Sequence, residues 1–218
     1  MSGAEAIACG ACLRRALLVA LLASRIAGML DRPGSRVSGL LALPEDELLA
    51  AVAGPRAEQI QEALDARDLD ADRGAFARAG VVAVCRHSSV YPSQLWELAD
   101  APAVLFAAGR LEAFEQLQSE PAVAVVGTRS PSPYGREVAH ALGRGLGAAG
   151  VPVVSGLALG IDATAHRGCL AGGGLPVAVL ACGPDVAYPR RHRALHREVR
   201  ERGLVLAELP PGTRPKCG

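Results

Sequence analysis

Two apolar segments in the C-terminal half of the chain each run directly into a glycine-bearing turn and then a helix. Residues 122–126 precede the turn Gly127-Thr128-Arg129, and residues 151–155 precede a loop at 156–162. In an open parallel sheet, such turns emerge at the carboxyl edge, where ligands bind. Exposed backbone N–H groups and the positive helix end make each turn a potential phosphate cradle. The pair predicts a ligand with more than one phosphate, and nucleic acid is the natural candidate.

The alternation of strand and helix continues after these two turns. Expected strands are residues 122–126, 151–155, 176–181 and 204–208. Alternation of this kind predicts βαβ units and a mostly parallel sheet, so the fold class is α/β. The strands are apolar almost throughout, as expected when helices cover both faces. The first intervening helix should bury the apolar face formed by Val138, Leu142, Leu146 and Ala149.

The N-terminal part of the chain predicts short helices. Leu13, Leu17, Ala20 and Leu21 recur at helical spacing and indicate one apolar face. Two further helices around Gly54-Pro55 resemble a helix-hairpin-helix, a DNA-backbone binder, and a plain packing module is the alternative. The expected domains are a helical module at 1–80, a short strand-containing extension and linker at 81–120, and the sheet domain at 121–218.

Charge and cysteine content narrow the function classes. The 218 residues carry a net charge of +1, so any nucleic-acid site must be a local patch. Cys9-Gly10-Ala11-Cys12 stands without a second such pair, so no metal site is predicted, and the remaining cysteines indicate a reducing cytoplasm. The apolar run at 16–23 is too short to span a bilayer as a helix, and no membrane association is expected.

The two turns differ in their chemistry. Gly127 allows close approach of an anion, Thr128 offers a hydroxyl, and Arg129 can make a bidentate contact to phosphate. The second loop lacks the glycine fingerprint of dinucleotide-binding proteins. There, Asp162 is expected to cap the following helix, with His166 one turn further on. No serine or cysteine nucleophile accompanies this Asp-His pair, so catalysis is not predicted.

A third segment, after the expected strand 176–181, is basic. Tyr188 is followed by three arginines and a histidine across residues 190–193, at the start of a helix. Cations at a helix N-terminus oppose the helix dipole, so the cluster is unfavourable without an anion. Aromatic stacking together with guanidinium contacts suits single-stranded nucleic acid. A solvated charged face is the alternative.

Three motif blocks between Val123 and Pro189 carry a specific resemblance. They read G-T-R-x-P-x-x-Y-G, S-G-L-A-x-G-I-D-x-x-A-H and G-G-x-x-x-A-V-L-x-x-G-x-D-x-x-Y-P. In this order and spacing they look like the DprA/Smf family of DNA-processing proteins. The segment from Tyr91-Pro92 to Gly109 is also similar to that family, so the resemblance covers most of the chain.

The resemblance implies a Rossmann-like domain that binds single-stranded DNA, dimerises and helps to load a RecA-type recombinase during natural transformation. It implies neither enzyme activity nor a cofactor. The residues assigned to DNA or phosphate binding, from the resemblance and the loop chemistry, are Gly127, Thr128, Arg129, Ser155, Gly156, Gly160, Tyr188, Arg190, Arg191 and Arg214.

Two departures from the family pattern stand out. His192 occupies a position where the family usually has asparagine. The chain also ends at Lys216-Cys217-Gly218, where the family continues into further strands, so the Rossmann-like domain is expected to be incomplete. Loss of those strands should remove part of any dimer surface and leave an apolar strand edge uncovered, with poor solubility as the consequence.

Three other functions remain as alternatives. The first is a hydrolase of nucleotide derivatives on a related fold, similar to the phosphoribohydrolases that activate cytokinins. That class resembles P-G-G-x-G-T-x-x-E, whereas Gly172-Gly173-Gly174 is followed here by Leu175-Pro176. The others are a non-catalytic sensor of nucleotide-like ligands and a non-functional remnant of a longer protein.

Overall fold

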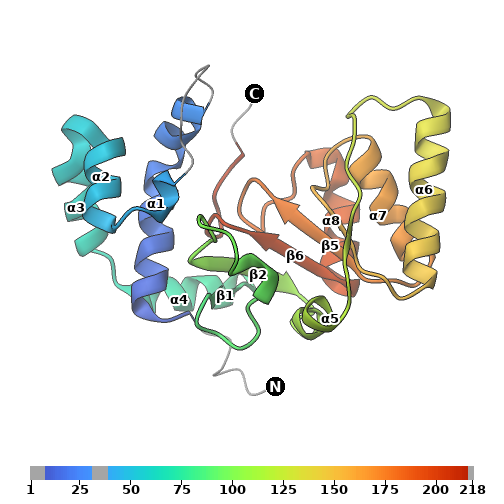
Figure 1. Cartoon of the computed structure of the whole chain (residues 1–218), viewed down its shortest axis with the longest axis horizontal. Coiled ribbons are helices and arrows are strands. Elements are labelled where there is room, and N and C mark those ends of the chain that lie inside the picture. Colours follow the sequence, from blue (N-terminus) through green and yellow to red (C-terminus); the bar gives the residue numbers. More distant parts are fainter. Residues whose placement is uncertain (1–7, 31–38, 216–218) are drawn as a thin grey trace.

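Six strands form one sheet that runs through the molecule (Figure 1). The computed structural model describes residues 8–30 and 39–215; Lys216 to Gly218 lie outside these ranges. The strand order is β1-β2-β6-β5-β4-β3. The strands are β1 (Val82–Cys85), β2 (Val104–Gly109), β3 (Val123–Ala124), β4 (Val153–Ser155), β5 (Pro176–Leu180) and β6 (Leu204–Ala207). An α/β fold with a helical N-terminal region is therefore confirmed.

The sheet is mostly parallel, with an antiparallel pair at one side. β3, β4, β5 and β6 run in the same direction, as the strand–helix alternation predicts. β2 returns antiparallel to β6, with Phe106 opposite Ala207, and β1 pairs antiparallel with β2. β6 thus has partners along both edges. The uncovered apolar edge expected from the sequence is absent at this strand, because β2 occupies it.

Helices and short 3-10 turns account for most of the remaining described chain. The helices are α1 (Gly10–Leu30), α2 (Glu45–Ala53), α3 (Ala57–Asp65), α4 (Leu69–Arg78), α5 (Ala113–Ser119), α6 (Pro133–Ala148), α7 (Ile161–Ala171) and α8 (Arg193–Arg202). The 3-10 turns are η1 (Leu40–Ala42), η2 (Gly54–Arg56), η3 (Ser93–Leu95) and η4 (Arg190–His192). Among the described helices, none is long and apolar enough to cross a membrane.

Local sequence explains where several helices begin. Acidic residues occupy the first turn of α2, where the positive N-terminal end of the helix stabilises their negative charge. The Asp68 side chain accepts hydrogen bonds from the N–H groups of Asp70 and Ala71 and so caps α4. Ser132 caps α6 by accepting from the Gly135 N–H, and Pro133 follows at the first helical position, where its missing N–H costs nothing.

One continuous core joins the N-terminal helices to the sheet. Buried side chains of α1, α4, α7 and α8 pack with those of β1, β2, β5 and β6 in a single cluster. Phe76 of α4 meets Phe106 of β2 edge to face at 5.4 Å between ring centroids. Residues 81–120, expected as an extension and linker, supply β1 and β2 to the same sheet, and their helix α5 packs against it.

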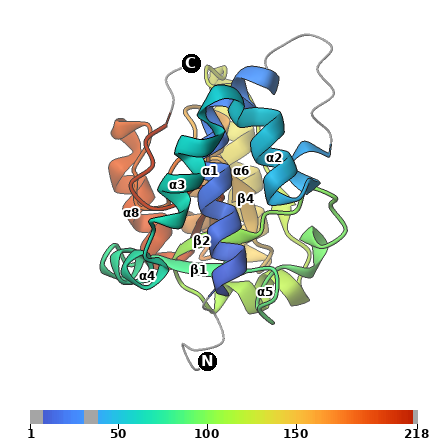
Figure 2. The same ribbon diagram turned by 90° about the vertical axis from the view of Figure 1, so that its left-hand side faces the viewer.

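The buried face of α1 differs in part from the expected one. Leu13 and Leu17 are buried as predicted, but Leu21 is 40% exposed and Leu18 and Leu22 are buried instead. α2 and α3 pack on the side of α1 that faces away from the sheet (Figures 1 and 2). α1 is therefore covered on two sides, which is why its apolar surface is wider than one stripe.

Helices cover the two faces of the sheet unequally. On the face opposite α7 and α8, the strands are covered by α5, by the loops at residues 86–103 and 121–122 and by Leu41 of η1. A pocket of about 840 Å³ remains there, and Val179 of β5 is half exposed in it. Both-sided helical cover, expected from the apolar strands, is thus only partly realised.

The helices α6 and α7 approach each other through glycine. A Cβ on Gly147 would lie 2.6 Å from the Cys169 carbonyl oxygen, and one on Gly143 would overlap the Ala165 carbonyl. The apolar face expected on α6 is only partly buried, because Leu146 packs against the core but Val138 and Leu142 are 44% and 47% exposed. Close backbone packing selects the glycine side of the helix rather than the side with larger side chains.

Candidate nucleic-acid interface

The turn after β3 is a tight structure that leaves Arg129 in solvent. The Thr128 hydroxyl oxygen accepts a hydrogen bond from the Ser130 N–H at 3.1 Å, which fixes the turn. A Cβ at Gly127 would lie 2.7 Å from Cγ1 of Ile161, so no larger residue fits there. The Arg129 side chain is exposed at the carboxyl edge of the sheet.

Hydrogen bonds join the turn after β3 to the loop after β4. The Ile161 N–H, at the start of α7, donates to the Thr128 carbonyl at 3.2 Å. Gly160 has a φ of 85°, and a Cβ there would overlap the Thr128 carbonyl oxygen. The Ser155 hydroxyl is buried and donates to the Val125 carbonyl at 2.6 Å. Ser155 and Gly160 therefore link the two loops, whereas residues 127–129 and Gly156 are exposed.

Asp162 has a different role from the expected helix cap. The N-cap of α7 is Gly160, which has no side chain to offer, and Asp162 lies inside the first turn. Its Oδ2 accepts a hydrogen bond from the Gly156 N–H at 3.1 Å. That N–H is therefore already satisfied inside the protein. The expected phosphate cradle at this loop loses one of its donors for that reason.

His166 is completely buried on α7. Neither ring nitrogen has a hydrogen-bond partner among the described residues. Burial lowers its pKa to about 4, an effect that the Ser155 backbone and the Asp162 carboxylate oppose only in part. The ring is neutral at physiological pH and shielded from solvent. Asp162 and His166 are both buried, so they do not form an exposed acid–base pair.

The third segment, after β5, folds back onto the second loop. His192 is buried, and its Nδ1 donates to the Leu157 carbonyl at 3.0 Å. Leu157 has a φ of 56°. Arg190 and Arg191 lie in η4 and are exposed, and the Tyr188–Pro189 peptide bond is cis.

The segment that follows β6 completes this edge. Both carboxylate oxygens of Asp185 accept from the Gly212 N–H, at 2.9 and 3.1 Å. The Gly183 N–H donates to the Thr213 carbonyl at 2.8 Å. These bonds hold residues 209–215 against the loop after β5, which brings Arg214 to the same side as the first two turns.

A pocket of about 610 Å³ lies where these loops meet. Four of the sequence-assigned residues line it, namely Arg129, Gly156, Tyr188 and Arg214. None of the described residues that line it is acidic. The two arginines give it positive charge, and the phenol ring of Tyr188, which is 43% exposed, gives it an aromatic surface. Gly127, Thr128, Ser155, Gly160, Arg190 and Arg191 lie outside its lining.

The opposite wall of this pocket comes from α1, which the sequence did not assign to the site. Its contribution is a strip of small residues, Ala20, Ala23, Ser24 and Ala27. Their spacing of three and four residues places them on one helix face. That periodicity is visible in the sequence, but only the folded chain shows which surface the face meets.

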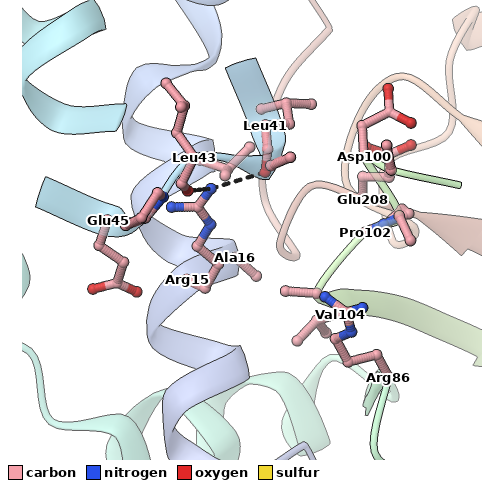
Figure 3. Close-up of a pocket in the computed structure, with 16 residues that line it drawn as sticks. Arg15, Ala16, Leu41, Leu43, Glu45, Arg86, Asp100, Pro102, Val104 and Glu208 are labelled. Carbon is pink, nitrogen blue, oxygen red and sulfur yellow. Dashed lines mark hydrogen bonds between the residues drawn. The ribbon is translucent and has the colours of Figure 1, made fainter. Parts of the chain in front are cut away.

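A neighbouring pocket of about 260 Å³ is lined by both acidic and basic residues (Figure 3). Asp100 and Glu208 lie together on one side, and Arg15 and Arg86 come from other elements. Arg15 donates to the Leu41 and Leu43 carbonyls at 2.9 and 2.7 Å, so its charge is used within the protein. Loss of surrounding water and the Asp100 carboxylate raise the pKa of Glu208, although this residue is partly open to solvent. Glu45 also lines this pocket, so three carboxyl groups make it a poor match for phosphate.

A sequence model of the family described as DNA recombination-mediator protein A matches residues 82–218. The chain belongs to this family. The match includes all the strands, the three loops and both arginines of the 610 Å³ pocket. The DprA/Smf resemblance drawn from the motifs is thereby confirmed. Residues before 82, including α1, lie outside the matched range.

Curated relatives agree with this assignment to the DNA recombination-mediator family. The chain is 44% identical over 142 residues to the putative DNA processing protein DprA of Mycobacterium tuberculosis, covering 65% of the chain and 33% of the relative. It is 41% identical over 128 residues to protein Smf of Synechocystis, covering 59% and 32% respectively. The chain thus spans about a third of the length of these relatives.

Two solved structures of DNA processing protein A resemble the fold. The one from Streptococcus pneumoniae has a TM-score of 0.65 and 28% identity, and the alignment covers 94% of this chain and 68% of that one. The one from Helicobacter pylori has a TM-score of 0.53 and 29% identity over 62% of this chain and 59% of its own. The second structure is described as giving insight into a single-stranded DNA binding mode of that protein.

Proposed function

We propose that this chain binds single-stranded DNA along its carboxyl sheet edge, as a non-enzymatic DNA-processing protein. The observation that carries the proposal is the convergence of Arg129, Tyr188 and Arg214 on one pocket, whose described lining residues include no acidic side chain. Guanidinium groups bind phosphates through charge-assisted hydrogen bonds, and an aromatic face stacks on any base. Membership of the family and the DNA-binding relative from Helicobacter pylori support the same reading.

The geometry favours backbone contacts over base reading. Arg190 and Arg191 are exposed beside the pocket in η4 and extend its positive charge along the surface. Among the described helices, α1 lines the pocket, and its three alanines and Ser24 offer no bidentate donor–acceptor pattern for a base. We therefore expect little sequence preference and weaker binding to duplex, whose bases are not free to stack on Tyr188.

The test is a titration of the protein against a fluorescent oligo-dT at several salt concentrations. A few phosphate contacts should give a falling affinity with salt, with a slope of about 0.7 per contact in log–log form. A duplex of equal length is the matched control. Binding without salt dependence, or equal binding of duplex and single strand, would contradict the proposal.

A nucleotide-sized ligand in the same pocket is the competing function. ADP-ribose and mononucleotides should compete poorly with oligo-dT, because they reach only part of the positive surface. Competition at equimolar concentration would favour the small-ligand reading instead. On the strength of the family resemblance, we also propose that the chain has a RecA-type recombinase as its partner and acts in the cytoplasm. Pull-down of the recombinase on DNA-coated beads tests the partner.

A further inference from the structure

Four potential metal ligands converge where the start of α1 meets the end of β1. Cys9 precedes α1, Cys12 lies in its first turn, Cys85 is the last residue of β1, and His87 follows two residues later. One ligand atom from each residue lies within 4.8 Å of all the others. Two segments separated by more than seventy residues of sequence thus bring three sulfurs and one imidazole together.

The distances in this cluster fit a tetrahedral ion. The sulfur atoms of Cys9 and Cys12 lie 3.5 and 3.4 Å from Nδ1 of His87. A tetrahedral zinc ion, with Zn–S of about 2.3 Å and Zn–N of about 2.0 Å, holds sulfur and nitrogen ligands about 3.5 Å apart. A thiol–imidazole hydrogen bond would account for one of these pairs, but not for four ligand atoms around one point.

We propose that Cys9, Cys12, Cys85 and His87 bind a structural Zn²⁺ ion. Three thiolates and one imidazole are a ligand set that zinc takes in structural sites, and soft sulfur ligands exclude Mg²⁺ and Ca²⁺. Four protein ligands fill the tetrahedron and leave no position for a substrate or water. The site therefore stabilises the fold and carries no reaction.

The backbone around the cluster is already ordered by other contacts. The Ala8 N–H donates to the Ala83 carbonyl of β1 at 2.8 Å, and Arg73 donates to the Ala8 carbonyl at 2.9 Å. The Cys12 N–H is directed to the Cys9 sulfur. Three thiolates and Zn²⁺ leave one net negative charge, which the positive N-terminal end of α1 favours.

The ion would join the helical N-terminal region to the edge of the sheet. Cys9 and Cys12 belong to the chain before and within α1, whereas Cys85 and His87 belong to β1 and the turn after it. Cys9 and His87 are exposed, which gives an ion a path into the site, and Cys12 and Cys85 are buried. Zinc here would hold α1 in register with β1 in a way that side-chain packing alone does not.

The sequence signal for this site is Cys85-x-His87. A search for a second Cys-x-x-Cys pair does not detect it, because one residue rather than two separates the ligands and the second ligand is histidine. The distance of 72 residues between Cys12 and Cys85 also hides the pairing, since no local spacing links them.

The experiment measures metal content of the full chain, purified under reducing conditions without added chelator. We expect about one zinc per chain by plasma mass spectrometry, as for a closed structural site. His87→Ala, at an exposed position, should lose the zinc without disturbing the core, and Cys85→Ser should lose it as well. His140→Ala, also exposed, and Cys182→Ser, also buried, are the matched controls and should retain it.

Cobalt gives an independent readout. Metal-stripped protein titrated with Co²⁺ should develop the visible bands of a tetrahedral thiolate site, saturating at one ion per chain and reversing on addition of Zn²⁺. Far less than one zinc per wild-type chain would overturn the proposal, as would equal zinc in wild type and His87→Ala. A thiol count showing a disulfide among Cys9, Cys12 and Cys85, or another metal at full occupancy, would overturn it too.

Discussion

His192 donates from Nδ1 to the carbonyl oxygen of Leu157 at 3.0 Å, and both residues are buried. This bond joins the basic segment after β5 to the loop after β4, across 35 residues of sequence. Leu157 is held with a φ of 56°, a region that non-glycine residues rarely adopt. The two loops therefore behave as one unit at the edge of the proposed DNA site.

Removing this bond should weaken both folding and DNA binding. His192→Ala leaves the buried Leu157 carbonyl without its partner, which costs about 1–3 kcal/mol of unfolding free energy. His192→Asn, which retains a side-chain donor, should recover part of the loss. Urea unfolding measures the first effect and oligo-dT anisotropy the second. His140→Ala, at an exposed position on α6, is the control, and an equal effect there would contradict the assignment.

Arg129→Ala should weaken binding of single-stranded DNA by about 1.5–3 kcal/mol, the range for hydrogen bonds to charged groups. Arg110→Ala is the matched control, because Arg110 is also exposed but follows β2 at the opposite edge of the sheet. Its removal should change affinity little. The measurement is anisotropy with oligo-dT at one fixed salt concentration. Equal affinities for the two variants would remove Arg129 from the interface.

Two glycines on the same helix should respond in opposite directions to alanine. Gly145→Ala meets nothing within 4 Å on the exposed side of α6, so it should stabilise by about 0.5–1 kcal/mol through helix propensity. Gly143→Ala would push Cβ into the Ala165 carbonyl and should destabilise the chain by about 1–3 kcal/mol. Thermal melts of the two variants provide the comparison. A stabilising Gly143→Ala would mean that α6 and α7 are further apart than described.

We expect the folded chain to lose stability in mild acid because His166 is buried in its neutral form. Its pKa is lowered by burial to about 4 in the folded chain, against 6.5 for the unfolded one. The unfolded state therefore binds the proton first, and stability falls as pH drops from about 6.5 to 4, by roughly 3 kcal/mol in total. Above pH 6.5 this residue contributes no pH dependence. Urea midpoints of wild type and His166→Gln across this range should diverge in this way, and parallel curves would contradict it.

Sequence reasoning predicted the parts of the fold that depend on local pattern. The four parallel strands and the helices between them follow from the alternation of apolar and helical segments, and each strand lies within its expected range. Periodicity did not predict which face of α6 is exposed. The close approach of Gly143 and Gly147 to α7, rather than the burial of the larger side chains, decides how this helix is oriented. A helix wheel ranks residues by apolar area and does not register contacts that need the absence of a side chain.

The candidate site was likewise predictable from the sequence only in part. Arg129, Gly156, Tyr188 and Arg214 were assigned from their motifs, and the structure brings all four to one pocket. The buried positions of Ser155 and Asp162 could not be predicted, because both depend on partners across a turn or an adjacent strand. The α1 wall was also out of reach, since it arises only when the N-terminal helix packs beside loops more than a hundred residues later.

The central place of β6 has a consequence for how the chain folds. Among the described strands it is the last to be synthesised, yet it separates β2 from β5. Until residues 204–207 are available, β1 with β2 and β3 with β4 and β5 are two separate sheets that share no strand pairing. Contacts this distant in sequence slow folding, because the chain must close long loops before the contacts stabilise it. Nascent protein on the ribosome would thus carry two unjoined apolar edges, which chaperones are suited to shield until β6 bridges them.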